Sequence, residues 1–136
     1  MSKDKVQISN EAQSPKSQKT DKSQYNLEER TAKFGEDVIK FLGSLPKNTV
    51  NNVLVSQLVR SATSVGANYM EADGAESKKD FKHKIAISKK EAKEGRHWLR
   101  MVSTANSQLA PACRQLWQEA TELSLIFSAI IRKLSS

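Results

Sequence analysis

Residues 77–102, SKKDFKHKIAISKKEAKEGRHWLRMV, carry the clearest structural signal in this chain of 136 residues. Steps of four and three residues link its apolar and small side chains, which places them on one stripe of an α-helix. Ser77 can cap this helix, with Asp80 in the first turn. Because the middle of the stripe is small or polar, a neighbouring helix must approach closely there or polar groups must pair there. The stripe consists of Phe81, Ile85, Ser88, Ala92, Gly95, Leu99 and Val102.

Three further segments show helical periodicity. The first begins at Leu27 and stops before Pro46, and the second runs from about residue 48 to Gly74, which can take a left-handed cap conformation. The last begins near Pro111, after a short loop at 106–110. Four helices with short connections predict an all-α, antiparallel up-down-up-down four-helix bundle over residues 25–136. The three stripes are Leu27, Thr31, Phe34, Val38, Phe41 and Leu45; Leu54, Leu58, Ala62, Val65, Tyr69 and Ala72; and Leu116, Ala120, Leu123, Phe127, Ile130 and Leu134.

The N-terminal residues 1–24 have a different composition, MSKDKVQISNEAQSPKSQKTDKSQ. Ser, Gln and Lys dominate, and almost nothing apolar is available for burial. Such a segment cannot offset its ordering entropy, so the sequence predicts a disordered basic tail. Either this tail is merely solvated or it contacts RNA. The sequence contains neither a membrane-spanning run nor a signal peptide, and its one cysteine fits a reducing cytosol, so a cytoplasmic location is expected.

Residues that could support catalysis or bind a metal are sparse. His83 and His97 lie fourteen residues apart on one predicted helix, about 21 Å along its axis, and Cys113 has no ligand at suitable spacing. The pairs Glu94-x-x-His97 and Asp80-x-x-His83 approximate those of a di-metal carboxylate bundle. Because both pairs lie on the same helix, they cannot face each other across one core. The sequence therefore predicts no catalytic residues, no metal, no cofactor and no enzymatic activity.

A polar stripe flanks the apolar one in the helix near residue 60. It consists of Arg60, Ser64, Asn68 and Glu71, which step by four, four and three residues and so share a face. Glu91 and Glu94 of the next helix are candidates to meet Arg60 across the two helices. A buried network of this kind would fix helix register and subunit contacts. The predicted structural and oligomer network comprises Arg60, Ser64, Asn68, Glu71, Glu91 and Glu94.

Basic residues concentrate on the helix that begins after Ser77. Residues 77–100 hold nine Lys or Arg and three acids, which accounts for nearly all of the net charge of +7. One face of this helix could track phosphates without reading bases, or could simply be solvated. Trp98 either packs between helices or stacks on a base. The predicted nucleic-acid-binding residues are Lys82, Lys89, Lys93, Arg96 and Arg100.

Residues 56–72, SQLVRSATSVGANYMEA, and residues 77–81, SKKDF, resemble the "four helix bundle protein" family, also called the 23S rRNA-intervening-sequence protein family. Its pattern reads Q-L-x-R-A-x-x-S-I-x-x-N-I-x-E-G, followed after a turn by S-x-x-E-F. The similarity covers about residues 25–135. Ala72 replaces a common Gly, and Ala75-Glu76 replaces a turn that is often basic, which weakens a nucleic-acid role for that turn.

The resemblance implies an antiparallel four-helix bundle that assembles as a ring-shaped homopentamer and has no known enzymatic activity. Related proteins are accessory subunits of diversity-generating retroelements, where they bind a reverse transcriptase and nucleic acid. We therefore expect a non-enzymatic homo-oligomer that binds RNA or DNA, or a nucleic-acid enzyme such as a reverse transcriptase, through the basic face. The alternative is a protein–protein adaptor with no nucleic-acid contact.

Overall fold

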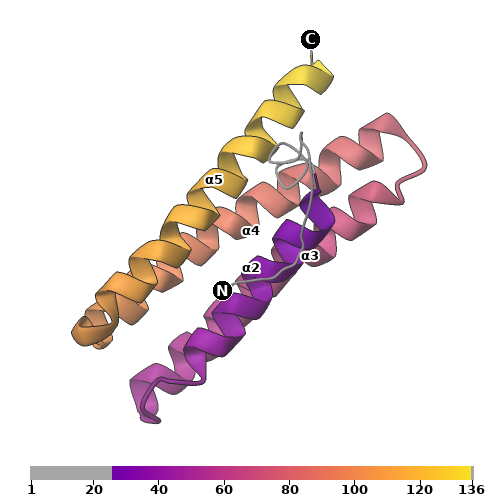
Figure 1. Ribbon diagram of the computed structural model, residues 1–136. Coiled ribbons are helices and arrows are strands. Elements are labelled where there is room, and N and C mark those ends of the chain that lie inside the picture. The colour runs from indigo at the N-terminus through magenta and orange to yellow at the C-terminus, as the bar shows by residue number, and fades with distance from the viewer. Residues whose placement is uncertain (1–25, 136) are drawn as a thin grey trace, which may run out of the picture. The chain divides into compact units, whose positions relative to one another are not determined.

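The computed structural model of the chain describes residues 26–135 (Figure 1). Four α-helices follow one another, and no strand occurs within these residues. Consecutive helices run in opposite directions, as the colour gradient in Figure 1 shows, and α4 packs against both α3 and α5. The predicted four-helix fold is confirmed, while the predicted tail over 1–24 lies outside the described residues. The elements are α2 Leu27–Leu42, α3 Thr49–Asp73, α4 Lys78–Ala105, the 3₁₀ turn Ser107–Leu109 and α5 Ala110–Ser135.

The helix ends follow the local sequence. Asn48 caps α3 by accepting the Asn51 N–H at 2.8 Å, and Ser77 caps α4 by accepting the Asp80 N–H at 3.0 Å. The expectation of a left-handed cap at Gly74 is wrong, because its φ of −97° lies in the right-handed half of the map. The Gly74 N–H instead bonds the Met70 carbonyl and continues the helical pattern, so the turn does not require left-handed backbone at this position.

Large apolar side chains fill the interior of the unit formed by residues 31–135. All four predicted stripes need adjustment, and in α3 and α4 the change is one residue each, because Tyr69 and Phe81 are half-buried rather than buried. In α2, Leu42 is buried and Phe41 is half-buried. In α5, the middle of the stripe is buried, but Leu116, Ile130 and Leu134 are half-buried, since a straight helix drifts about 20° per heptad away from its seam. The largest fully buried apolar side chains are Phe34, Phe127, Leu58, Ile85, Leu99, Leu123, Val38, Val65 and Val102.

Small and polar residues let α3 lie close to both of its neighbours. A Cβ added at Gly66 would lie 3.3 Å from the Thr31 hydroxyl of α2, so the two backbones are nearly in contact there. On the other side, the buried Ser88 hydroxyl of α4 donates to the Val65 carbonyl at 3.0 Å. The small, polar middle of the α4 stripe thus forms the polar pairing that its sequence suggests.

One buried polar pair was not foreseen from the sequence. The side-chain amides of Asn51 and Asn106 exchange two hydrogen bonds, of 3.0 and 2.9 Å, and both residues are almost fully buried. Asn51 also donates to the Pro46 carbonyl, and Asn106 to the Val102 carbonyl. This pair joins the start of α3 to the end of α4 and leaves its amide groups satisfied.

Candidate functional site

The side of α4 that faces α3 carries a compact charged cluster. Arg60 of α3 donates to Glu91 at 3.2 Å and also pairs with Glu94. The Trp98 indole N–H donates to the same Glu94 carboxylate at 2.9 Å. Glu91 is almost buried, with 12% of its side chain exposed, whereas Arg60 keeps 48% exposed. Arg60 therefore meets the two acids that the sequence singles out, and Trp98 joins them through its indole nitrogen.

Hydrogen bonds and charge keep this cluster ionised. The indole N–H of Trp98, followed by the Arg60 guanidinium, lowers the pKa of Glu94 below its ordinary value. The hydrogen bond to Glu94 in turn raises the pKa of Arg60. Arg60 and Glu94 thus stay charged at neutral pH, and Arg60 offsets one of the two negative charges that it contacts on α4.

The other members of the predicted polar network lie elsewhere. Ser64 donates to the Arg60 carbonyl and Asn68 to the Ser64 carbonyl, so both are bonded within their own helix. Glu71 pairs with Lys84 of α4, and this ion pair lies about three helical turns along α3 from Arg60. The six residues therefore form two separate ion-pair sites bridging α3 and α4, with a locally bonded segment between them.

The predicted basic face of α4 lies on another side of the helix. Lys93 and Arg100 are exposed, and Lys82 and Lys89 are half-buried. Within residues 26–135, none of these four forms an ion pair. Lys89 and Lys93, together with Lys90, also line a shallow depression of about 360 Å³ that reaches Ile131 of α5. This face thus runs along the groove between α4 and α5.

Arg96 differs from the rest of the basic face. It is half-buried, donates to the Thr121 hydroxyl at 3.1 Å, and holds its guanidinium carbon 5.0 Å from the centre of the Trp117 ring. Its Nε is buried and has no hydrogen-bond partner in the described part of the chain. Arg96 therefore joins α4 to α5, and it offers less free charge to a ligand than Lys93 or Arg100.

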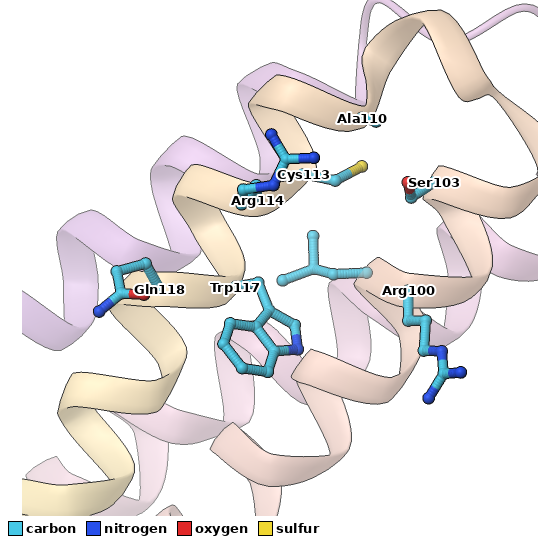
Figure 2. Close-up of a pocket in the computed structure, with 8 residues that line it drawn as sticks. Arg100, Ser103, Ala110, Cys113, Arg114, Trp117 and Gln118 are labelled. Atoms are coloured by element: carbon cyan, nitrogen blue, oxygen red, sulfur yellow. The ribbon is translucent and has the colours of Figure 1, made fainter.

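A second pocket in the α4–α5 groove was not anticipated from the sequence. Its volume is about 430 Å³, and Figure 2 shows Trp117 and Arg114 on α5 facing the segment of α4 that carries Arg100 and Ser103. Trp117 is 39% exposed, which is high for a residue of this size. In the sequence, Trp117 follows Leu116 of the apolar stripe, and this position places its indole at the edge of the helix interface. That position is the feature of the sequence that could have indicated the pocket.

The histidines and the cysteine do not assemble into a metal site. Over residues 26–135, no three His, Cys, Asp or Glu side chains are grouped so that they could hold a metal ion. His83 and His97 are exposed, and the His97 ring packs edge-on against Trp98. Cys113 is buried, which raises the pKa of its thiol and makes it a poor nucleophile. None of the helices described has the length and apolar character needed to span a membrane.

Comparisons with known proteins agree with this architecture. The fold is that of a small helical-bundle protein whose polar residues bridge neighbouring helices. The chain belongs to the 23S rRNA-intervening sequence protein family, whose profile matches residues 23–129. A search of the curated proteins gave no match.

A solved structure from Bacteroides thetaiotaomicron VPI-5482 is similar to this chain. It is described as a protein with unknown function from the S23 ribosomal protein family. The two sequences are 28% identical, and the match has a TM-score of 0.69. It covers 77% of this chain and 94% of that chain, so the likeness extends over nearly the whole of the solved protein.

Proposed function

We propose that this protein is a non-enzymatic, homo-oligomeric helical bundle that binds nucleic acid in the cytoplasm through the basic face of α4. The observation that carries the proposal is the row of unpaired cations along this helix. Within residues 26–135, no acid forms an ion pair with any of its four freest members. The proposed phosphate-binding residues are Lys82, Lys89, Lys93, Arg96 and Arg100.

The spacing of these cations suits a phosphate backbone. Lys89, Lys93 and Arg100 follow one another by four and seven residues, so they lie on one face and extend over about 16 Å. Binding of phosphates releases condensed counterions, which gives an affinity that falls steeply with salt and depends little on sequence. Glu91 and Glu94 share the cation of Arg60 on the α3 side of the helix, so they oppose such binding less than two free acids would.

Fluorescence anisotropy with labelled RNA and DNA tests this function. We expect binding at about 50 mM salt that weakens strongly by about 200 mM. Lys93→Glu should weaken binding and reduce the salt slope by at least about one unit. Lys40→Glu makes the same change of charge at an exposed position of α2 and is the matched control. The absence of binding to either nucleic acid at low salt would overturn the proposal.

The homo-oligomer, a pentamer by family resemblance, is supported by apolar side chains at the surface of the single chain. Val50 and Val53 are each 58% exposed and lie three residues apart on α3, and Leu125 of α5 is 63% exposed. Arg60 and Glu71 keep enough exposure to contact a neighbouring subunit as well. Light scattering should give several times the mass of one chain, and a monomer over the working concentration range would exclude this part of the proposal.

The same exposed apolar residues support a second candidate function, a protein adaptor. A reverse transcriptase is the partner that the family resemblance suggests. Co-purification from the native host separates the two functions. A stoichiometric protein partner without nucleic acid would favour the adaptor, whereas nucleic acid that survives washing at low salt and is released at high salt would favour the first function.

A further inference from the structure

The Trp117 pocket is lined by an exposed aromatic residue, two arginines and no acid. Arg100 and Arg114 line it from different helices, and neither forms an ion pair within the described residues. Ser103 and Gln118 add hydrogen-bonding groups at the lining, and Leu99 adds apolar surface. A ligand that fits this lining has a flat aromatic part, polar edges and negative charge close by.

The Trp117 ring is held in place before any ligand arrives. Arg96 lies over the ring and is itself fixed by its hydrogen bond to Thr121. Arg96 is not among the residues that line the pocket. An aromatic side chain that is fixed in this way loses little conformational freedom when a second ring stacks on it.

The pocket is continuous in position with the basic face. Lys89 and Lys93 line the other depression of the α4–α5 groove, and Arg100, two helical turns beyond Lys93, lines the pocket. A polynucleotide that follows the lysines therefore arrives at Trp117. In a duplex the bases are stacked inside and cannot enter a pocket between two helices, whereas an unpaired base can turn outward and stack on an aromatic ring.

The geometry points to a binding site for one unpaired base of a single-stranded polynucleotide, stacked on Trp117, with its flanking phosphates on Arg100 and Arg114. This inference rests on the proposed function. It adds that the nucleic acid is single-stranded and that Trp117 is the residue that contacts its base. A volume of about 430 Å³ lies within the range of roughly 300–1,000 Å³ that is typical of small-molecule sites and accommodates a nucleobase.

The first experiment uses the unaltered protein and three ligands with matched numbers of phosphates. These are a short single strand of RNA or DNA, the same strand with abasic sugars, and a duplex. We expect the normal single strand to bind about 5- to 150-fold more tightly than the abasic strand, which is the usual range for the stacking of one base on an aromatic residue. Equal affinity for all three would overturn the base site and leave the basic face intact as a phosphate site. No binding of any of them would instead overturn the proposed function.

Variants then assign the effect to the ring. Trp117→Ala should remove the preference for the normal strand, and Trp117→Phe should restore most of it, because phenylalanine keeps an aromatic face. Trp98→Phe leaves Trp117 as the only tryptophan, so the fluorescence of this variant should be quenched by the single strand and little changed by the abasic strand. A preference that persists in Trp117→Ala, with the fold intact by circular dichroism, would place the base elsewhere.

Discussion

The two sides of α4 handle charge in opposite ways. Toward α3, Glu91 and Glu94 share the cation of Arg60, and Glu91 is nearly buried. Toward α5, Lys89, Lys93 and Arg100 meet no acid within residues 26–135, and two depressions open beside them. Charges that are neutralised inside the chain support the fold, whereas charges left unpaired are available to a partner. Four predictions test whether this division is real.

The largest expected effect concerns the paired side. Arg60→Ala leaves Glu91 nearly buried without its cation, so we expect the free energy of unfolding to fall by about 1–3 kcal/mol. Urea denaturation measures this loss. Nucleic-acid affinity, after correction for unfolded protein, should fall less than in Lys93→Glu, because Arg60 lies outside the basic face and its loss acts only through the acids that it leaves unpaired.

Lys33→Ala is the matched control for Arg60→Ala. It removes an exposed ion pair with Asp37 within α2, where the lysine is 73% exposed, and should cost less than about 0.5 kcal/mol. If Arg60→Ala cost no more than this control, the cluster between α3 and α4 would not be a stabilising feature, and the comparison between the two sides would fail.

The next prediction concerns the close packing of α3. A Cβ at Gly95 would lie 3.8 Å from the Ser61 hydroxyl, an ordinary contact, so Gly95→Ala should stabilise the fold by about 0.5–1 kcal/mol through helix propensity. At Gly66 the new Cβ would lie 3.3 Å from the Thr31 hydroxyl, and α2 would have to move. Gly66→Ala should therefore gain less than Gly95→Ala, and thermal denaturation of the pair shows whether α2 approaches α3 more tightly than α4 does.

A smaller effect should appear as a pH dependence. The pKa of Glu94 is lowered in the folded protein, so its ionised form adds stability above the ordinary glutamate pKa of about 4.3, and this stability is lost as the pH falls through the lowered value. Trp98→Phe removes the largest cause of that shift. The difference in free energy of unfolding between the original protein and Trp98→Phe should be constant above about pH 6 and shrink toward pH 3.

Urea titrations at several pH values measure this gap. The packing lost with the indole contributes equally at every pH, so only the part that changes with pH reports on Glu94. A gap that stayed constant down to pH 3 would mean that the hydrogen bond from Trp98 does not hold the carboxylate in its ionised form.

The smallest expected effect lies on the unpaired side. Lys93→Ala and Arg100→Ala remove exposed cations that have no partner among the described residues, so their free energies of unfolding should stay within about 0.5 kcal/mol of the original protein. Their affinity for nucleic acid should nevertheless fall. A clear loss of stability in either variant would show that the basic face also holds the bundle together.

The sequence predicted the fold more completely than the site. The heptad stripes and the approach of Arg60 to the α4 acids follow from spacing on a helix, and the cap at Ser77 follows from residue type. The predicted grouping of Ser64 and Asn68 with that cluster did not form, because each hydroxyl or amide found a carbonyl one turn earlier in its own helix. Spacing shows which residues share a face of a helix, but it does not show which hydrogen bond a side chain forms.

By itself, the sequence determined that four amphipathic helices form and that one of them carries nearly all of the net charge. Periodicity and charge are local properties, and they can be read from neighbouring positions along the chain. Only the tertiary structure decided which charged side chains form ion pairs within the protein. The pairing of Glu91 with Arg60, the packing of Arg96 on Trp117, and the pocket between Arg100 and Arg114 each depend on how two helices distant in sequence are rotated against each other.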